Sequence, residues 1–372
     1  MKKIKIVIFF FLICQFFDSN NLYAGPTMLD LWSGQSHFVL NQNPAPVPSV
    51  GHREAFVVYR FDISTSTIYL YHRCFNNGLP EICLSVSNDN GQSFPIQYGV
   101  IISTEYGYFS VAPSVINNNG LWIMVYEEGG STKGTYWATS TNGINWTKQG
   151  SLFSENVYRA TPGIYKSQGN IYVFSAEHID ADSLGIIFHS GPNMTNLVQW
   201  GGGYVLTGTE DWEHGSVSMP RIFYDNQFHW MSYEGGTQNL NCGYGSSEQN
   251  MYGWGIARST NLTSWEKYVG NPIMQGLDIE SCGYDMPQPF RHTGTGEIFV
   301  YYTSDNTGLV LRDKLSFGSA CSYWQTYPNW KEKNHICMPS CGGIGGTACY
   351  QTKDCQSGTK VGISWDCVSC CR

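Results

Sequence analysis

The sequence predicts an all-β fold, a five-bladed β-propeller followed by a small disulfide-rich C-terminal domain. Four short apolar strands each begin with a proline, and the prolines are 49, 58 and 67 residues apart, close to the length of one four-stranded blade. Phe, Trp and Tyr make up 15% of the 372 residues and 41 residues are Gly, which suits pleated strands joined by tight turns. Eight of the 13 cysteines lie after residue 320, which indicates a stapled C-terminal module.

The proline-led strands define the blades. A turn and a second strand rich in aromatic residues follow each of them, at 121–126, 171–174, 228–233 and 298–302. The first strand of every propeller blade lines the central channel, so the prolines mark where a functional site is expected. They are Pro113, Pro162, Pro220 and Pro287.

Residues 1–24 have the pattern of a secretory signal peptide. Lys2 and Lys3 precede an apolar run at 6–17, and the small residues Ala24 and Gly25 follow. The run is too short for a secure membrane span, and no later segment approaches about 18 consecutive apolar residues. We therefore expect an exported, extracellular protein without a membrane span.

The propeller is assigned to residues 25–320 and the disulfide-rich module to residues 321–372. The strands of blade 1 are expected at 53–61, 67–74, 82–87 and near 99–103, and blades 2 to 5 begin near residues 111, 160, 217 and 285. Blade 5 lacks a closing strand after residues 308–314. We expect the stretch 29–40, upstream of blade 1, to supply that strand and seal the ring.

A second repeat follows the third strands, at 87–94, 140–146 and 259–265. Each copy has a Ser, an Asp or Asn two residues later and a closing Phe or Trp. Asp and Asn in such turns accept local backbone hydrogen bonds. We interpret them as turn formers and not as ligands.

Cysteine usage favours disulfides over metal binding. Cys14 lies in the signal peptide and leaves an even number, as expected in an oxidising compartment. Cys74 and Cys83 can staple a hairpin, and a Cys242–Cys282 bridge would stiffen the loops that enter blades 4 and 5. No His-x-x-x-His pair indicates zinc, so we expect no cofactor, and a structural calcium ion at the channel stays open. The C-terminal module is either an appendage or a binding module.

The chain resembles the five-bladed glycoside hydrolases of families 43, 32, 62, 117 and 130 over roughly residues 35–318. The resemblance rests on the proline-led inner strands, on the Ser-x-Asn-Leu-x-x-Trp turn at 259–265 and on the segment 163–177. It implies a propeller that hydrolyses glycosidic bonds in its central channel. The turn at 87–94 is also similar to the Asp boxes of sialidases, which are six-bladed.

The family 43 type implies three carboxylates at fixed places relative to the inner-strand prolines. The general base precedes the blade 1 proline, and Glu54 before Ala55 is the best match. The other two places, after the blade 2 proline and two residues before the blade 3 proline, hold Ser114 and Ala160. The resemblance therefore does not extend to the standard triad.

Hydrolysis of a glycosidic bond needs two carboxyl groups, one that donates a proton and one that activates water or attacks the sugar. Asp285 lies two residues before Pro287, at a position expected to point into the channel. We predict Glu54 and Asp285 as the principal catalytic pair. Glu213, on a loop before blade 4, is the alternative acid.

Other polar residues near strand ends are predicted to bind the substrate. Arginines cluster at inner-strand starts, which indicates either an acidic sugar or neutralisation of the channel acids. Acids also end other second strands, and we expect Glu127 and Asp305 there to lie on solvated turns. Trp212 and Trp254 are candidates for stacking on a sugar. The predicted binding residues are His52, Arg53, Arg159, Arg221, Glu177, His178 and Trp212.

A net charge of −8 with only 21 Lys and Arg argues against nucleic acid or anionic membrane as the main partner. We expect a carbohydrate substrate or ligand. The missing acids favour an alternative, a lectin-like propeller that binds carbohydrate or a surface without catalysis. A weaker alternative is a sialidase-like hydrolase, which needs a buried Tyr paired with a Glu and three converging arginines. Its candidates are Tyr158, Tyr233 and Tyr284.

Overall fold

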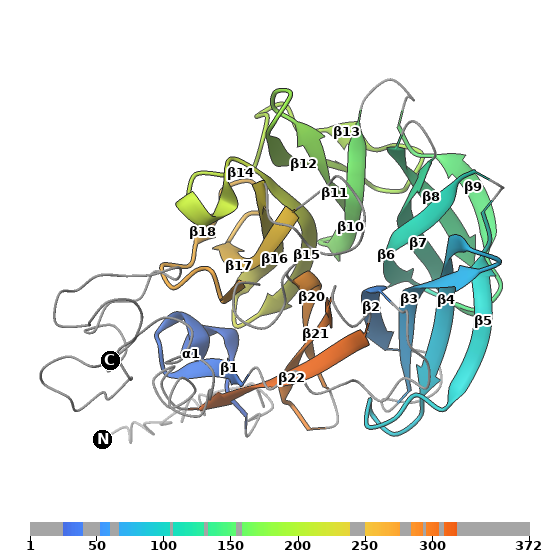
Figure 1. The fold of residues 1–372 in the computed structure, drawn as a ribbon, viewed down its shortest axis with the longest axis horizontal. Coiled ribbons are helices and arrows are strands. Elements are labelled where there is room, and N and C mark those ends of the chain that lie inside the picture. Colours follow the sequence, from blue (N-terminus) through green and yellow to red (C-terminus); the bar gives the residue numbers. More distant parts are fainter. Residues whose placement is uncertain are drawn as a thin grey trace, which may run out of the picture.

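The fold is a ring of five antiparallel sheets around a common centre, so the predicted five-bladed propeller is confirmed (Figure 1). This computed structural model describes residues 25–39, 53–59, 67–104, 107–129, 133–153, 158–238, 250–275, 284–292, 295–304 and 309–317. The predicted signal peptide and the predicted C-terminal module lie outside the described residues.

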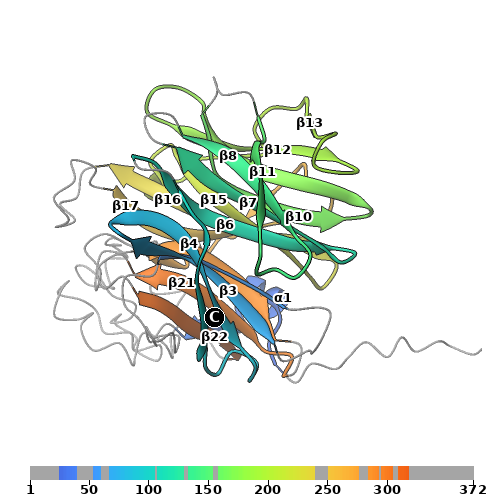
Figure 2. The same ribbon diagram turned by 90° about the vertical axis from the view of Figure 1, so that its right-hand side faces the viewer.

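Blades 1 and 2 are four-stranded sheets with strands in sequence order from the centre outward. Blade 1 consists of β2 (Arg53–Tyr59), β3 (Ile68–Asn76), β4 (Leu79–Ser87) and β5 (Ile96–Ile102). Blade 2 consists of β6 (Phe109–Asn118), β7 (Leu121–Gly129), β8 (Lys133–Ser140) and β9 (Thr147–Ser151). Figure 2 shows β6, β7 and β8 side by side in the view turned by 90°.

In blades 3 and 4 the third strand pairs on its outer edge with two short pieces. Blade 3 consists of β10 (Arg159–Ser167), β11 (Asn170–His178), β12 (Leu184–Gly191), β13 (Val198–Gln199) and β14 (Leu206–Thr207). A short 3-10 helix η1 (Asp211–Glu213) precedes blade 4. Blade 4 consists of β15 (Val217–Asp225), β16 (Phe228–Gln238), β17 (Asn250–Ser259), β18 (Glu266–Lys267) and β19 (Met274–Gln275).

Blade 5 is closed by the N-terminal end of the propeller, as predicted. Its strands are β20 (Tyr284–Arg291), β21 (Ile298–Ser304), β22 (Leu309–Phe317) and the early strand β1 (Ser36–Val39). β1 pairs antiparallel with β22, with Ser36 opposite Phe317. Strands far apart in sequence thus share one sheet and close the ring.

The first part of the predicted closing stretch is a helix and not a strand. Helix α1 (Met28–Trp32) begins at Thr27, whose hydroxyl accepts from Asp30 N at 3.3 Å while the Asp30 carboxylate accepts from Thr27 N at 2.7 Å. This reciprocal capping favours a helical turn. Met28 N also donates to Asp225 in blade 4 at 2.9 Å, which anchors the segment to a neighbouring blade.

The core lies between neighbouring blades and is rich in aromatic rings. Tyr69 of blade 1 stacks on Trp122 of blade 2, with ring centroids 5.4 Å apart, and both side chains are buried. Trp230 is also buried. This packing fixes neighbouring blades and hence the walls of the channel.

The repeated turns after the third strands are structural in all three copies. In the first, Asp89 Oδ1 accepts from Ser93 N at 2.8 Å and Phe94 is fully buried beneath the turn. In the others, Asn142 and Asn261 accept from the backbone N–H groups two and three residues later. Their carboxylate and amide oxygens are used within the turn.

Candidate active site in the central channel

The inner strands of all five blades share one irregularity. Pairing with the second strand shifts by a bulge, at 53–56, 111–114, 160–163, 218–221 and 285–288. In blades 2 to 5 the residue before the proline has a φ between 50° and 54°, at Ala112, Thr161, Met219 and Met286. Non-glycine residues rarely adopt this conformation, at a cost of about 1–3 kcal/mol each. The fold thus keeps a strained backbone at the channel.

Side chains from the preceding blade hold this strained backbone. Glu127 of β7 accepts from Thr161 N at 3.0 Å, and the Thr161 hydroxyl accepts from Met219 N at 3.2 Å. Glu234 of β16 accepts from Met286 N. Each bond gives a buried N–H group the acceptor that the bulge denies it. Hydrogen bonds therefore run from blade to blade around the channel.

Arg221 fills the centre of the channel. Its guanidinium donates to the carbonyl oxygens of Pro162, Pro220 and Pro113 at 2.9, 3.1 and 3.4 Å. It also lies 3.7 Å from Met286 Sδ and 5.6 Å from the Phe56 ring, so it contacts all five blades. The side chain is 2% exposed. We predicted Arg221 to bind substrate, but the structure uses it as an axial link between blades.

The inner strands of blades 3 and 4 approach to backbone contact near Arg221. A Cβ atom on Gly163 would lie 2.1 Å from the Pro220 carbonyl oxygen. Only glycine fits there, which explains why a Gly follows the blade 3 proline while an Arg follows the blade 4 proline.

The two principal acid positions lie on the neighbouring inner strands at the junction of blades 5 and 1. Gln288 of β20 accepts from Val57 N at 2.7 Å and donates to Val57 O at 2.9 Å. Glu54 lies three residues before Val57, and Asp285 lies three residues before Gln288. Inner strands of neighbouring blades run in the same direction, so Glu54 and Asp285 lie near the same end of adjacent strands, where Arg53 and Asp285 are each the last paired residue before the bulge. Their side chains, that of Arg53 and the whole of His52 lie outside the described residues.

The blade 2 and blade 3 side of the channel holds no acid at the two places that the family 43 type implies. The Ser114 hydroxyl accepts from Ile164 N at 3.0 Å and is buried. Ala160 is fully buried. Both positions serve packing between inner strands.

Glu213, the predicted alternative acid, is part of a closed network and not of the channel. Its carboxylate accepts from Lys267 Nζ at 2.5 Å, from Tyr233 Oη at 2.8 Å and from the N–H groups of Thr209 and Glu210 at 2.7 and 2.8 Å. The residue is fully buried. Oε2 accepts from three of these donors and Oε1 from one, and the residue is closed to solvent, so in this structure the Glu213 carboxylate serves the network and does not face an open site.

The same network argues against the sialidase-like alternative at Tyr233. Tyr233 is paired with Glu213, as that chemistry requires, but burial and the Glu213 charge raise the Tyr233 pKa well above its ordinary value. A phenol that resists ionisation is a poor nucleophile.

Trp212 and Trp254 lie in the core and not on open loops. Trp212 is 7% exposed, and its ring lies against Gly235, Gly253 and Gly255, where any Cβ atom would clash with it. Trp254 is 1% exposed and packs against Phe38 with centroids 5.0 Å apart. The glycines around Trp212 make room for its indole. Both indole rings are buried, so neither can stack on a sugar.

Arg159 and Glu177 pair with each other near the start of β10. Arg159 Nε lies 2.8 Å from Glu177 Oε2, which matches neutralisation of an acid better than capture of an acidic sugar. The His178 ring is exposed, lies 4.6 Å from the Tyr158 ring and has Nδ1 3.2 Å from Asp180 O. Of this group, His178 is the residue most open to solvent.

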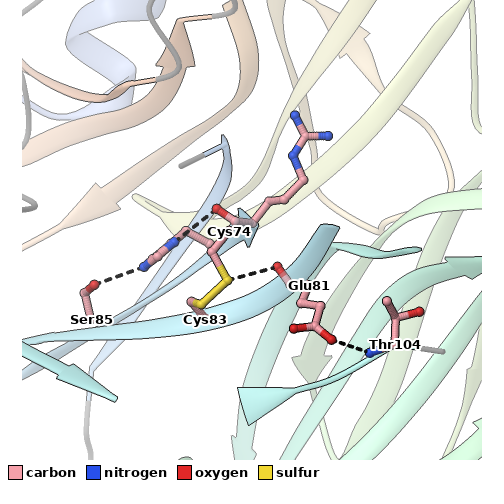
Figure 3. Close-up of a disulfide and its surroundings, with 7 residues drawn as sticks. Cys74, Glu81, Cys83, Ser85 and Thr104 are labelled. Carbon is pink, nitrogen blue, oxygen red and sulfur yellow. Dashed lines mark hydrogen bonds between the residues drawn. A yellow bond between two sulfur atoms is a disulfide. The ribbon is translucent and has the colours of Figure 1, made fainter. Parts of the chain in front are cut away.

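The predicted Cys74–Cys83 disulfide is present and joins β3 to β4 (Figure 3). Beside it, the Glu81 carboxylate accepts from Thr104 N at 2.9 Å and ties β4 to the connection that leads into β6. Cys242 and Cys282 lie outside the described residues. In the described part of the chain, no group of three or more His, Cys, Asp or Glu side chains is arranged to hold a metal ion.

Glu127 and Glu234 are two buried acids whose places the sequence did not reveal. We expected Glu127 on a solvated turn, yet it is 5% exposed, and Glu234 is fully buried. Both stand opposite the last paired residue before a bulge, Val111 and Ser218. An acid directly after the Tyr that ends the aromatic part of a second strand was the available signal. Asp305 lies outside the described residues.

Comparison with solved structures finds many five-bladed glycoside hydrolases. A thermostable family 43 glycoside hydrolase superposes with a TM-score of 0.56 at 19% identity, over 74% of this chain and 92% of that one. The α-L-arabinofuranosidase from Lactobacillus brevis gives 0.53 at 12%, over 71% and 90%. The catalytic domain of a family 62 α-L-arabinofuranosidase from Coprinopsis cinerea gives 0.53 at 12%, over 76% and 96%.

The chain has the fold of these propeller hydrolases. No known protein family matches the sequence, and no curated protein is similar enough to match. The similarity is thus one of architecture at low identity, as the missing triad positions imply. Within the described residues, no helix is long and apolar enough to cross a membrane.

Proposed function

We propose that this protein is an exported glycoside hydrolase that cleaves oligo- or polysaccharides in its central channel. Glu54 and Asp285 are its two catalytic carboxyl groups. The observation that supports the proposal is the junction of blades 5 and 1, where Gln288 bonds to both backbone groups of Val57 and so joins the two inner strands that carry Asp285 and Glu54.

The roles follow from what hydrolysis requires. Glu54 occupies the place of the general base and activates water, or attacks the sugar, as an ionised carboxylate. Asp285 donates a proton to the leaving oxygen. Arg221 has its charge turned toward backbone carbonyl oxygens at the axis, so it takes no catalytic role in this proposal.

The lectin-like alternative rests on a specific observation. Ser114 and Ala160, at the places of two family 43 acids, are buried and engaged in packing. A propeller with too few carboxylates would bind a glycan and release it unchanged. The two proposals differ in turnover and not in binding.

Sugar release from a glycan panel tests the proposal. The full chain, with its disulfides oxidised, is incubated with arabinans, xylans and uronate-containing polysaccharides, and new reducing ends are measured. We expect release from at least one member. Glu54→Gln and Asp285→Asn should each lower the rate by about 10²–10⁴-fold, the usual contribution of one acid or base.

Glu266→Gln is the matched control, because it removes an exposed carboxylate that pairs with Arg258 on the outer edge of blade 4. It should keep the wild-type rate. Binding of a glycan without release of sugar by the wild type would contradict hydrolysis and support the lectin-like alternative.

A further inference from the structure

The second strand of blade 4 holds the inner strand of blade 5 on both sides of one peptide unit. Glu234 accepts from Met286 N, and the Ser232 hydroxyl donates to Pro287 O at 2.5 Å. Ser232 and Glu234 are both fully buried. Asp285, the proposed acid, is the residue directly before this held segment.

The same backbone position is held in two other blades, once by a carboxylate and once by a neutral hydroxyl. Glu127 holds Thr161 N, and the neutral hydroxyl of Thr161 holds Met219 N. A neutral acceptor therefore suffices to satisfy the strained N–H group. Burying a carboxylate at this place costs more free energy than burying a hydroxyl, unless the carboxylate charge interacts with another group.

What differs between the two carboxylate-held blades is the residue before the held one. In blade 3 it is Ala160, with no titratable group, and in blade 5 it is Asp285. A negative charge next to a second carboxyl group raises the pKa of that group. A proton donor needs such a raised pKa to keep its proton near neutral pH.

We propose that Glu234 is a positioning residue of the active site, which fixes the backbone at Met286 and places a negative charge beside Asp285. This inference rests on the proposed function. Glu234 acts through the neighbouring strand and does not itself touch the substrate.

The described charged groups to weigh beside Glu234 are Arg221 and the Glu213–Lys267 pair. Arg221 of β15 lies 3.7 Å from Met286 Sδ. Its positive charge therefore opposes the negative charge of Glu234, which bonds to the backbone of the same methionine. Glu213 and Lys267 bond with each other beside Tyr233, and side chains alternate along β16, so they lie on the face opposite Glu234. Glu234 is thus the negative charge held against the Asp285 segment by a described bond.

Glu234→Gln and Glu127→Gln form a matched pair for the test. Gln keeps an oxygen that accepts from the backbone N–H and removes only the charge, so both variants should fold with similar unfolding temperatures. We expect Glu234→Gln to lower kcat about tenfold with KM within twofold. It should also move the alkaline limb of the pH–activity profile to lower pH by at least about half a unit. Glu127→Gln should leave kcat, KM and the profile at wild-type values.

Equal effects of the two variants, or a Glu234→Gln profile that superposes on the wild type, would overturn the inference while leaving hydrolysis intact. Absence of turnover by the wild type would instead overturn the proposed function. A second readout needs no turnover: unfolding temperatures of Glu234→Gln and Asp285→Asn, alone and combined. We expect non-additive shifts for this pair and additive shifts for Glu127→Gln with Asp285→Asn. Additive shifts for both pairs would overturn the coupling of Glu234 to Asp285.

Discussion

The two sides of the channel use the same backbone and carry different chemistry. Blades 2 and 3 present Ser114 and Ala160, both buried and one of them bonded to Ile164 N. Blades 5 and 1 present Asp285 and Glu54, one on each of two strands that Gln288 joins. The bulge and the blade-to-blade bonds recur on both sides.

The difference separates support from catalysis. A strained residue before a proline is held by a neighbouring side chain in blades 3, 4 and 5 alike, so the device belongs to the fold. Within the bulge segments of the inner strands, an acid occurs in blades 5 and 1, at Asp285 and Glu54, and in none of blades 2 to 4. Fold similarity alone therefore does not locate the chemistry in this chain.

The largest expected effect comes from placing an acid on the side that lacks one. Ala160→Glu buries a charge at a fully closed position and should lower the free energy of unfolding by about 4 kcal/mol. Ala160→Gln introduces a side chain of nearly the same volume as Glu but without a charge. Comparison of the two variants therefore separates the effect of overpacking from the effect of charge. Denaturant unfolding measures both variants. A stable Ala160→Glu that also gains activity would show that both sides of the channel are equivalent.

Blades 3 and 5 each carry a buried neutral histidine, which predicts loss of stability in acid. Burial and the Arg312 charge lower the His292 pKa to about 4, and burial and Arg159 lower that of His189 to about 4. The unfolded chain binds these protons near the ordinary pKa of 6.5, so the stabilisation is complete above pH 6.5 and is lost as pH falls toward 4. Each histidine should contribute about 3 kcal/mol over this range.

Unfolding free energies of the wild type, His292→Gln and His189→Gln between pH 7 and pH 4 measure these contributions. In each variant the free energy of unfolding should fall less between pH 7 and pH 4, by the contribution of the histidine that was replaced. A fall of unchanged size in both variants would mean that other groups cause it.

A smaller effect compares the bonds that join inner strands on the two sides. Gln288→Ala leaves Val57 N and O without partners and should cost about 2 kcal/mol, while Ser114→Ala leaves only Ile164 N and should cost about 1 kcal/mol. Loss of alignment between Glu54 and Asp285 should lower kcat about tenfold in Gln288→Ala alone. Equal activity losses in the two variants would remove the distinction between the sides.

Much of the fold was predictable because each repeat carries local sequence signals for its bulge and its turn. Prolines mark the bulges, Ser and Asn or Asp mark the turns, and the lack of a closing strand in blade 5 pointed to the chain upstream of blade 1. The helix at Met28–Trp32 was missed because its capping depends on Thr27 and Asp30 within an otherwise apolar stretch.

The site was predicted less well because its residues are defined by contacts across blades. Arg221 follows a proline, as other channel residues do. Its guanidinium fills the axis, bonded to a carbonyl oxygen of blade 3, where Gly163 approaches the Pro220 carbonyl oxygen, and neither contact can be read from the sequence. Glu213 and Trp212 lie in a loop by sequence and in the core by structure. Glu234 became prominent only through its bond to Met286 N.

A double-mutant cycle on turnover tests most directly that Glu54 and Asp285 act together. On a glycan that the wild type cleaves, kcat/KM is measured for Glu54→Gln, Asp285→Asn and the double variant. Because residues that act as one unit are strongly non-additive, we expect each single variant to lose about 10²-fold or more and the double variant to be no slower than the slower single one. Rates within twofold of the wild type in both single variants would contradict catalysis at the junction of blades 5 and 1.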